Sequence, residues 1–123
     1  SMKRSDEIVI FHGGQYSPAK KKFFESVSKT MPQDCKWYHW GDIDYGGFSM
    51  LLRLRKEITS SIMPYRMSKY ELEKYENYTQ TFSKEYAEKL LKLYEEARLE
   101  DCRECLNYMV KHKIKLEQEA MLT

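Results

Sequence analysis

The order of apolar runs and amphipathic stretches in the first 58 residues most constrains the fold. Ile8 to Phe11 is a short apolar run rich in β-branched residues, and residues 35–40 form a second run rich in aromatics. An amphipathic stretch follows each run, at residues 17–30 and 48–58. Short runs without polar alternation are typical of strands buried on both faces of a parallel sheet. The alternation therefore predicts the α/β fold class with a parallel sheet flanked by helices.

Local signals set the expected ends of these elements. Ser17-Pro18 is typical of a helix start, because serine caps the first N–H groups and proline fits the first turn. Met31-Pro32 predicts the end of that helix. A weaker third strand is expected within residues 61–67, and Pro64 predicts that it lies at the edge of the sheet.

The pattern becomes helical after residue 67. We expect a polar helix or turn, an amphipathic helix that begins near Ser83, a third helix and a last helical segment, at residues 69–78, 82–97, 99–110 and 116–122. We therefore divide the chain into an α/β portion, residues 1–67, and a C-terminal helical segment, residues 68–123, that packs on the same domain. No apolar run approaches the roughly 18 residues of a membrane span, and no signal segment is apparent.

Composition limits the function classes. A chain of 123 residues has room for one core. Its net charge of +2 does not by itself indicate a nucleic-acid binder. Three cysteines without an export signal indicate a reducing cytosol. Cys102 and Cys105 have helical spacing, so we predict two reduced, metal-free side chains; zinc binding with His112 or Cys35 is the alternative.

The segment Gly41-Asp42-Ile43-Asp44 is the main candidate for chemistry. Ligands of α/β proteins bind beyond the carboxyl ends of strands, and this acidic pair follows the second predicted strand. Aspartates at i and i+2 are expected to point the same way, which suits Mg²⁺. Gly46 and Gly47 permit a tight entry into the next helix, whose first N–H groups could receive phosphate. The alternative is ordinary turn and cap chemistry, in which aspartates bond to nearby backbone.

Other polar residues are weaker candidates. Arg53, Arg55 and Lys56 follow the acidic turn and could contact DNA phosphates, although a solvated helix face explains them equally well. Glu117 and Gln118 could support the site from the last helix, or form an ordinary polar face. Two further sets are expected to be structural or exposed: His12 with His39, and Lys20 to Lys22.

Three segments of the chain carry a resemblance to a known family. Residues 39–55 contain G-D-I-D with an aromatic residue before it and Gly-Phe and a Leu-Arg helix after it. Residues 8–18 resemble a strand with a Gly-rich turn, and residues 116–120 read L-E-Q-E-A. Together they resemble the C-terminal domain of the JetD family of Wadjet plasmid-defence systems, which is similar to the Toprim domain of topoisomerase VI.

The resemblance implies a partial Toprim-like (Rossmann-like) sheet in a Mg²⁺-dependent DNA-cleaving component of a plasmid-restriction system. Asp42 and Asp44 would be the catalytic residues that hold Mg²⁺ or Mn²⁺. The implied partners are DNA and condensin-like SMC, kleisin and accessory subunits, and a homodimer is left open. The implied location is the cytoplasm, with no membrane association.

The resemblance also exposes a gap. Toprim sites use a glutamate at the end of an earlier strand, whereas the strand end here reads Phe11-His12-Gly13-Gly14. Because Ser1-Met2 looks like a tag remnant, we expect this chain to be an excised fragment with that glutamate upstream. The fragment alone should bind Mg²⁺ weakly and cleave poorly. In the full-length protein, alanine at Asp42 or Asp44 is expected to abolish cutting and leave stability nearly unchanged, because it relieves repulsion.

Two rival functions remain. A non-catalytic DNA-docking or subunit-interaction module of the same fold would show no response to divalent ions. Another D-x-D enzyme, such as a phosphatase or nucleotide-sugar transferase, fits less well. A phosphatase with an aspartate nucleophile would carry the acidic pair on its first strand with Thr or Val next, whereas Tyr45 follows here.

Overall fold

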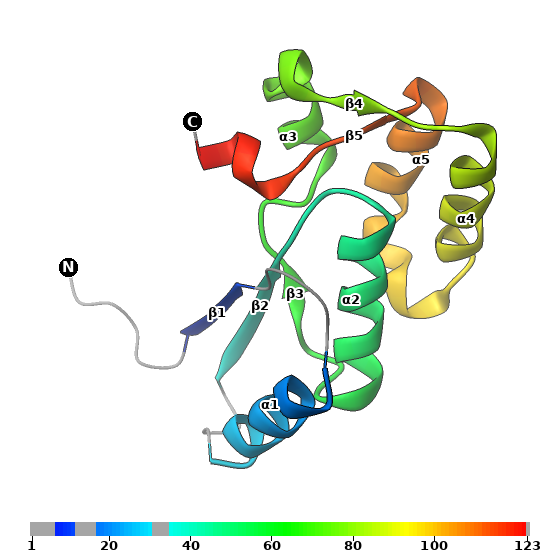
Figure 1. Cartoon of the computed structure of the whole chain (residues 1–123). Coiled ribbons are helices and arrows are strands. Elements are labelled where there is room, and N and C mark those ends of the chain that lie inside the picture. The colour runs from blue at the N-terminus through cyan, green and yellow to red at the C-terminus, as the bar shows by residue number, and fades with distance from the viewer. Residues whose placement is uncertain (1–6, 12–16, 31–34, 123) are drawn as a thin grey trace.

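A small parallel sheet with helical crossovers forms the first part of the fold (Figure 1). In the computed structural model, residues 7–11, 17–30 and 35–122 are described. The strands β1 (Glu7–Phe11), β2 (Lys36–Trp40) and β3 (Met63–Pro64) pair in the order β1-β2-β3. Both pairings are parallel, with Ile10 opposite His39 and His39 opposite Pro64. The predicted mixture of helices with a parallel sheet is therefore confirmed.

Two helices connect the strands as the pattern predicted. Helix α1 (Pro18–Thr30) follows Ser17, whose Oγ accepts a hydrogen bond from the N–H of Lys20 at 3.2 Å. Helix α2 (Tyr45–Glu57) follows the acidic turn. The strand β3 lies at the end of the sheet order, where a proline costs no ladder hydrogen bond. The predicted turn at residues 12–14 and the helix stop at Met31-Pro32 lie outside the described residues.

The second part of the chain contains both helices and an antiparallel ribbon. Its elements are α3 (Lys69–Lys74), the 3₁₀ turn η1 (Glu76–Tyr78), β4 (Gln80–Thr81), α4 (Lys84–Tyr94), the 3₁₀ segment η2 (Ala97–Cys102), α5 (Arg103–His112), β5 (Ile114–Lys115) and the 3₁₀ segment η3 (Gln118–Leu122). Ser83 caps α4 as expected, since its Oγ accepts from the N–H of Tyr86 at 3.2 Å.

Two features of this part differ from the sequence prediction. β4 pairs antiparallel with β5, with Gln80 opposite Lys115, although no strand was expected after residue 67. Leu116, expected to begin a helix, forms an isolated antiparallel bridge with Ile43. The two hydrogen bonds between their backbones measure 2.7 and 3.0 Å. These pairings bring the chain's C-terminal segment against the acidic turn.

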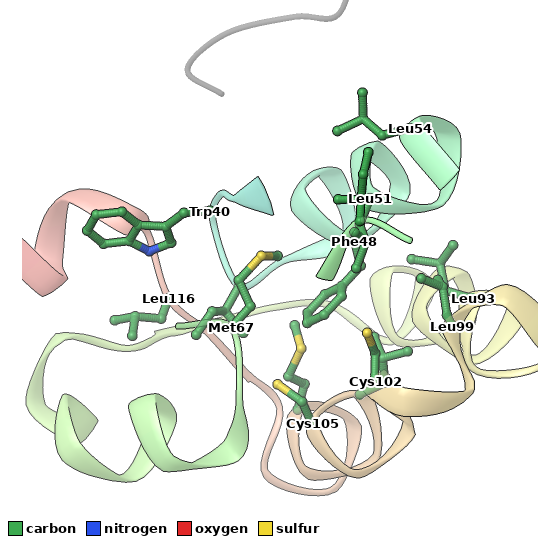
Figure 2. Close-up of a cluster of buried hydrophobic side chains, with 14 of the residues drawn as sticks. Trp40, Phe48, Leu51, Leu54, Met67, Leu93, Leu99, Cys102, Cys105 and Leu116 are labelled. Atoms are coloured by element: carbon green, nitrogen blue, oxygen red, sulfur yellow. The ribbon is translucent and has the colours of Figure 1, made fainter. Parts of the chain in front are cut away.

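One hydrophobic core joins the two parts of the chain. Helix α2 lies between the sheet and the helices α4 and α5 (Figure 1), and its Phe48, Leu51 and Leu54 are fully buried. Figure 2 shows these side chains in a cluster with Trp40 and Leu116 on one side and Leu99 on another. No helix in the described part of the chain is long and apolar enough to cross a membrane.

Candidate acidic site

The acidic turn connects the carboxyl end of β2 to the first turn of α2. Trp40 ends the strand, Gly41 is buried, and Tyr45 begins the helix. Asp42 and Asp44 therefore lie at the carboxyl end of a parallel strand, where the sequence predicted them. This is the end of a parallel sheet at which ligands of α/β proteins commonly bind.

Asp44 is the N-cap residue of α2. Its backbone is extended (φ −155°, ψ −178°), and its Oδ1 accepts a hydrogen bond from the N–H of Gly47 at 2.7 Å. This bond satisfies one of the N–H groups that a helix start leaves without an intrahelical partner. Gly47 itself has no room for a side chain, because a Cβ there would overlap the carbonyl oxygen of Asp42. Gly46 is exposed, and a Cβ there would lie 3.5 Å from the Oδ1 of Asp44, an ordinary contact.

Asp42 is held by the C-terminal segment. Its Oδ1 accepts a hydrogen bond from the N–H of Gln118 at 2.7 Å, across 76 positions of sequence. The Ile43–Leu116 bridge lies directly beside this bond. Residues 116–118 thus form one wall of the acidic turn, which places the predicted supporting residue Gln118 in the site through its backbone. Glu117 is exposed and close enough for its charge to act on Asp44.

The acidic pair is electrostatically coupled. Burial, the largest cause, raises the pKa of Asp44 above its ordinary value, and the neighbouring charge of Asp42 raises it further. The Gly47 hydrogen bond and the charge of Lys115 act in the opposite direction. Negative charge is therefore concentrated at this turn, and a cation placed there would relieve the repulsion.

Tyr86 is a member of the site that sequence reasoning did not single out. Its hydroxyl oxygen accepts a hydrogen bond from the N–H of Tyr45 at 2.7 Å. Burial, and then the charges of Asp44 and Asp42, raise the pKa of Tyr86 against the lowering effect of that hydrogen bond. Tyr86 lies on α4, 41 positions from Tyr45, so no local sequence signal connects the two residues.

The predicted phosphate-contact residues lie away from the acidic turn. Arg53 and Lys56 are exposed near the carboxyl end of α2, whereas Asp44 caps its amino end. At 1.5 Å per residue, Arg53 lies roughly 13 Å along the helix from the cap. Its Nε donates to Glu57 at 2.9 Å.

Arg55 belongs to the core. Its Nη1 and Nη2 each donate to a carboxylate oxygen of Asp101 at 2.8 Å, and its Nε donates to the carbonyl of Ile62 at 2.8 Å. The side chain is buried, so it ties α2 to the segment before α5 rather than forming a surface that could meet DNA phosphate.

His39 and the cysteine candidates are buried. His39 lies 3.3 Å by its Nε2 from the carbonyl oxygen of Gly47, behind the acidic turn. His12 lies outside the described residues. Cys102 and Cys105 are buried, as expected for apolar packing, and Cys35 is buried as well. Burial raises the pKa of the Cys102 thiol to about 12, and burial also raises the pKa of the Cys105 thiol. Within the described ranges, no group of three or more His, Cys, Asp or Glu side chains is arranged to hold a metal ion.

The fold and the turn together define an α/β domain that presents two carboxylates at a strand end. Its sequence matches the family described as Wadjet protein JetD, C-terminal, over residues 1–123, and the chain belongs to that family. It is 33% identical over 85 residues to the Wadjet protein JetD of Bacillus cereus (strain Q1). That alignment covers 69% of this chain and 21% of the relative, so the chain spans about a fifth of the curated protein's length. No solved structure matches the chain.

Proposed function

We propose that this chain forms the acidic metal-binding part of a Toprim-like domain that cleaves DNA within a Wadjet JetD protein. The observation that carries the proposal is the coupled pair Asp42 and Asp44 at the carboxyl end of β2. Membership of the JetD C-terminal family supports the assignment to a Wadjet JetD protein. The order of strand, helix, strand, acidic turn and helix is consistent with a partial Toprim-like sheet.

The residues of the turn fit a hard divalent cation in part. Each aspartate uses its Oδ1 to accept a backbone N–H. Of the described residues, none donates a hydrogen bond to the Oδ2 of either aspartate, so these two oxygens are the candidate ligands. Mg²⁺ is commonly bound through one or two carboxylates, with water and substrate phosphate as further ligands. When bound, the ion would polarise the phosphodiester and stabilise negative charge on its oxygens.

The protein's own contribution is to hold the two carboxylates rigidly. Asp44 is fixed by the first turn of α2, and Asp42 is fixed by the backbone of residue 118. The close packing of Gly47 on the Asp42 carbonyl sets the distance between turn and helix. Such support keeps the carboxylates in position before substrate arrives, which is the main requirement for electrostatic catalysis.

In the full-length setting, a further carboxylate is expected from an earlier strand, by the resemblance to Toprim domains. DNA is the proposed substrate, and condensin-like SMC, kleisin and accessory subunits are the proposed partners. The isolated chain should accordingly bind Mg²⁺ or Mn²⁺ weakly and cleave poorly.

Cleavage of supercoiled plasmid by the full-length gene product that carries this sequence tests the proposal. Asp42→Asn and Asp44→Asn preserve the acceptors for Gln118 and Gly47 while removing charge. Each variant should lose at least roughly a hundredfold in the rate of Mg²⁺-dependent nicking. Arg53→Gln, at the far end of α2, is the matched control and should cut normally. Wild-type cutting by both asparagine variants would overturn the proposal and leave a non-catalytic docking module.

A further inference from the structure

Two lysines lie beside the acidic turn on a pair of tyrosine rings. Tyr45 opens α2 directly after Asp44, and Tyr86 on α4 packs against it edge to face, with ring centres 6.4 Å apart. The Nζ of Lys89 lies 4.5 Å from the ring centre of Tyr45 and 5.7 Å from that of Tyr86. The Nζ of Lys115, on β5, lies 4.9 Å from the ring centre of Tyr86. We call these four residues the lysine–tyrosine patch.

The charges of this patch are available to a ligand. Within the described part of the chain, neither Lys89 nor Lys115 forms an ion pair with a carboxylate. Lys89 is exposed and Lys115 is partly exposed. Both ammonium groups instead rest on tyrosine rings, an arrangement that orients a cation without neutralising it.

The patch is adjacent to the acidic pair. Tyr45 follows Asp44 in sequence, and its N–H is bonded to the hydroxyl of Tyr86. The charge of Lys115 acts on Asp44, and the charges of both aspartates act on Tyr86. A nucleic-acid strand that binds at the acidic turn and runs on toward Tyr45 would therefore contact the lysine–tyrosine patch next.

A cationic patch beside the acidic turn would offset the repulsion between the two aspartates and DNA. A polyanion such as DNA is repelled by Asp42 and Asp44, and the chain's net charge of only +2 supplies little general attraction. Arg55 is buried, and Arg53 and Lys56 lie at the opposite end of α2, so these cations do not flank the turn. Lysine ammonium groups bind phosphate oxygens, so two of them beside the turn could hold a nucleic-acid backbone there.

We propose that the lysine–tyrosine patch is a binding site for the nucleic-acid backbone, in which Lys89 and Lys115 hold phosphates next to the scissile one. The site deepens, and rests on, the proposed DNA-cleaving function. Its ligand class is a phosphodiester strand, with Tyr45 and Tyr86 forming an aromatic floor beneath the two ammonium groups.

Binding of a fluorescein-labelled 30-base-pair duplex to the full-length gene product, followed by anisotropy in EDTA, tests the site. The double variant Lys89→Gln/Lys115→Gln should bind about tenfold more weakly, and its plot of log affinity against log salt should be shallower by about 2. The matched control Arg53→Gln/Lys56→Gln removes the same charge from the far end of α2 and should bind within about twofold of wild type. Lys89→Arg/Lys115→Arg should retain wild-type binding, and thermal melts check that each variant is folded.

The outcomes separate this inference from the proposed function. Unchanged binding by the glutamine pair, or equal weakening by the control pair, overturns the patch as a specific site. If the patch is overturned in this way but Asp42→Asn and Asp44→Asn still fail to cut plasmid, the proposed function stands. If the aspartate variants cut plasmid normally, the proposed function fails whatever the lysine variants do.

Discussion

The cap at Asp44 predicts that two substitutions of this residue differ in stability. Asp44→Asn retains a side-chain oxygen for the N–H of Gly47, whereas Asp44→Ala removes it. Loss of an N-cap acceptor costs about 1 kcal/mol, so the asparagine variant should be more stable than the alanine variant by that amount. For a chain of this length the difference corresponds to about 4 °C in Tm. Alanine is therefore not the neutral change expected from relief of repulsion alone.

The pH dependence of folding stability gives a second, independent test of the surroundings of Asp44. Burial raises the folded-state pKa of Asp44 above the unfolded value of 3.8. The protonated carboxyl is favoured in the folded state, so its stabilising effect is complete below pH 3.8 and is lost as pH rises through the folded pKa. The stability of Asp44→Asn relative to wild type should therefore grow between pH 3.5 and pH 7.

Urea unfolding of wild type and both variants at the two pH values, followed by circular dichroism, checks these expectations. Equal stability of the alanine and asparagine variants would refute the cap. A stability difference between Asp44→Asn and wild type that shrinks as pH rises would refute the assigned direction of the pKa shift.

Three further predictions follow from neighbouring packing. Gly47→Ala should lower the free energy of unfolding in urea by about 1–3 kcal/mol, because the new Cβ overlaps the Asp42 carbonyl. Gly46→Ala, whose Cβ makes only an ordinary contact, should be neutral or slightly stabilising. Equal effects of the two variants would contradict the close packing at Gly47. Asp101→Asn should cost about 1–2 kcal/mol at pH 7, less than a fully buried pair because Asp101 is partly exposed. Its pKa is lowered below the ordinary value of 3.8 by the hydrogen bond from Arg55, so the loss should shrink as pH falls below 3.8, and a loss that stays unchanged there would rule out the ion pair as its cause. The Cys102 thiol, whose burial raises its pKa to about 12, should react with Ellman's reagent at pH 8 only after urea is added, and rapid reaction of the folded chain would contradict its burial.

The elements of the first part were predictable because their signals are local. Apolar runs marked β1 and β2, and Ser17 and the acidic turn marked helix starts. The Asp44 cap satisfies a need that arises within four residues of chain, so the sequence carries it directly. The edge position of Pro64 followed for the same reason, since proline lacks an N–H.

The contacts that complete the site were not predictable because they join distant segments. β4 and β5 have two residues each and too few positions to show an alternating pattern. The 76-residue separation between Asp42 and Gln118 leaves no local trace. Leu116 has the apolar character of a helix face, yet its backbone pairs with Ile43 instead. Arg55 appeared to be one of three surface cations, and only tertiary packing on Asp101 distinguishes it.

Binding of Mn²⁺ to the full-length gene product tests the central claim, that the acidic pair is a metal site, most directly. Electron paramagnetic resonance counts free Mn²⁺ during a titration, and Mn²⁺ replaces Mg²⁺ at oxygen-rich sites. The account predicts that the double variant Asp42→Asn/Asp44→Asn binds one fewer Mn²⁺ than wild type, while Arg53→Gln binds the same number. Equal Mn²⁺ binding by wild type and a folded double variant would contradict it.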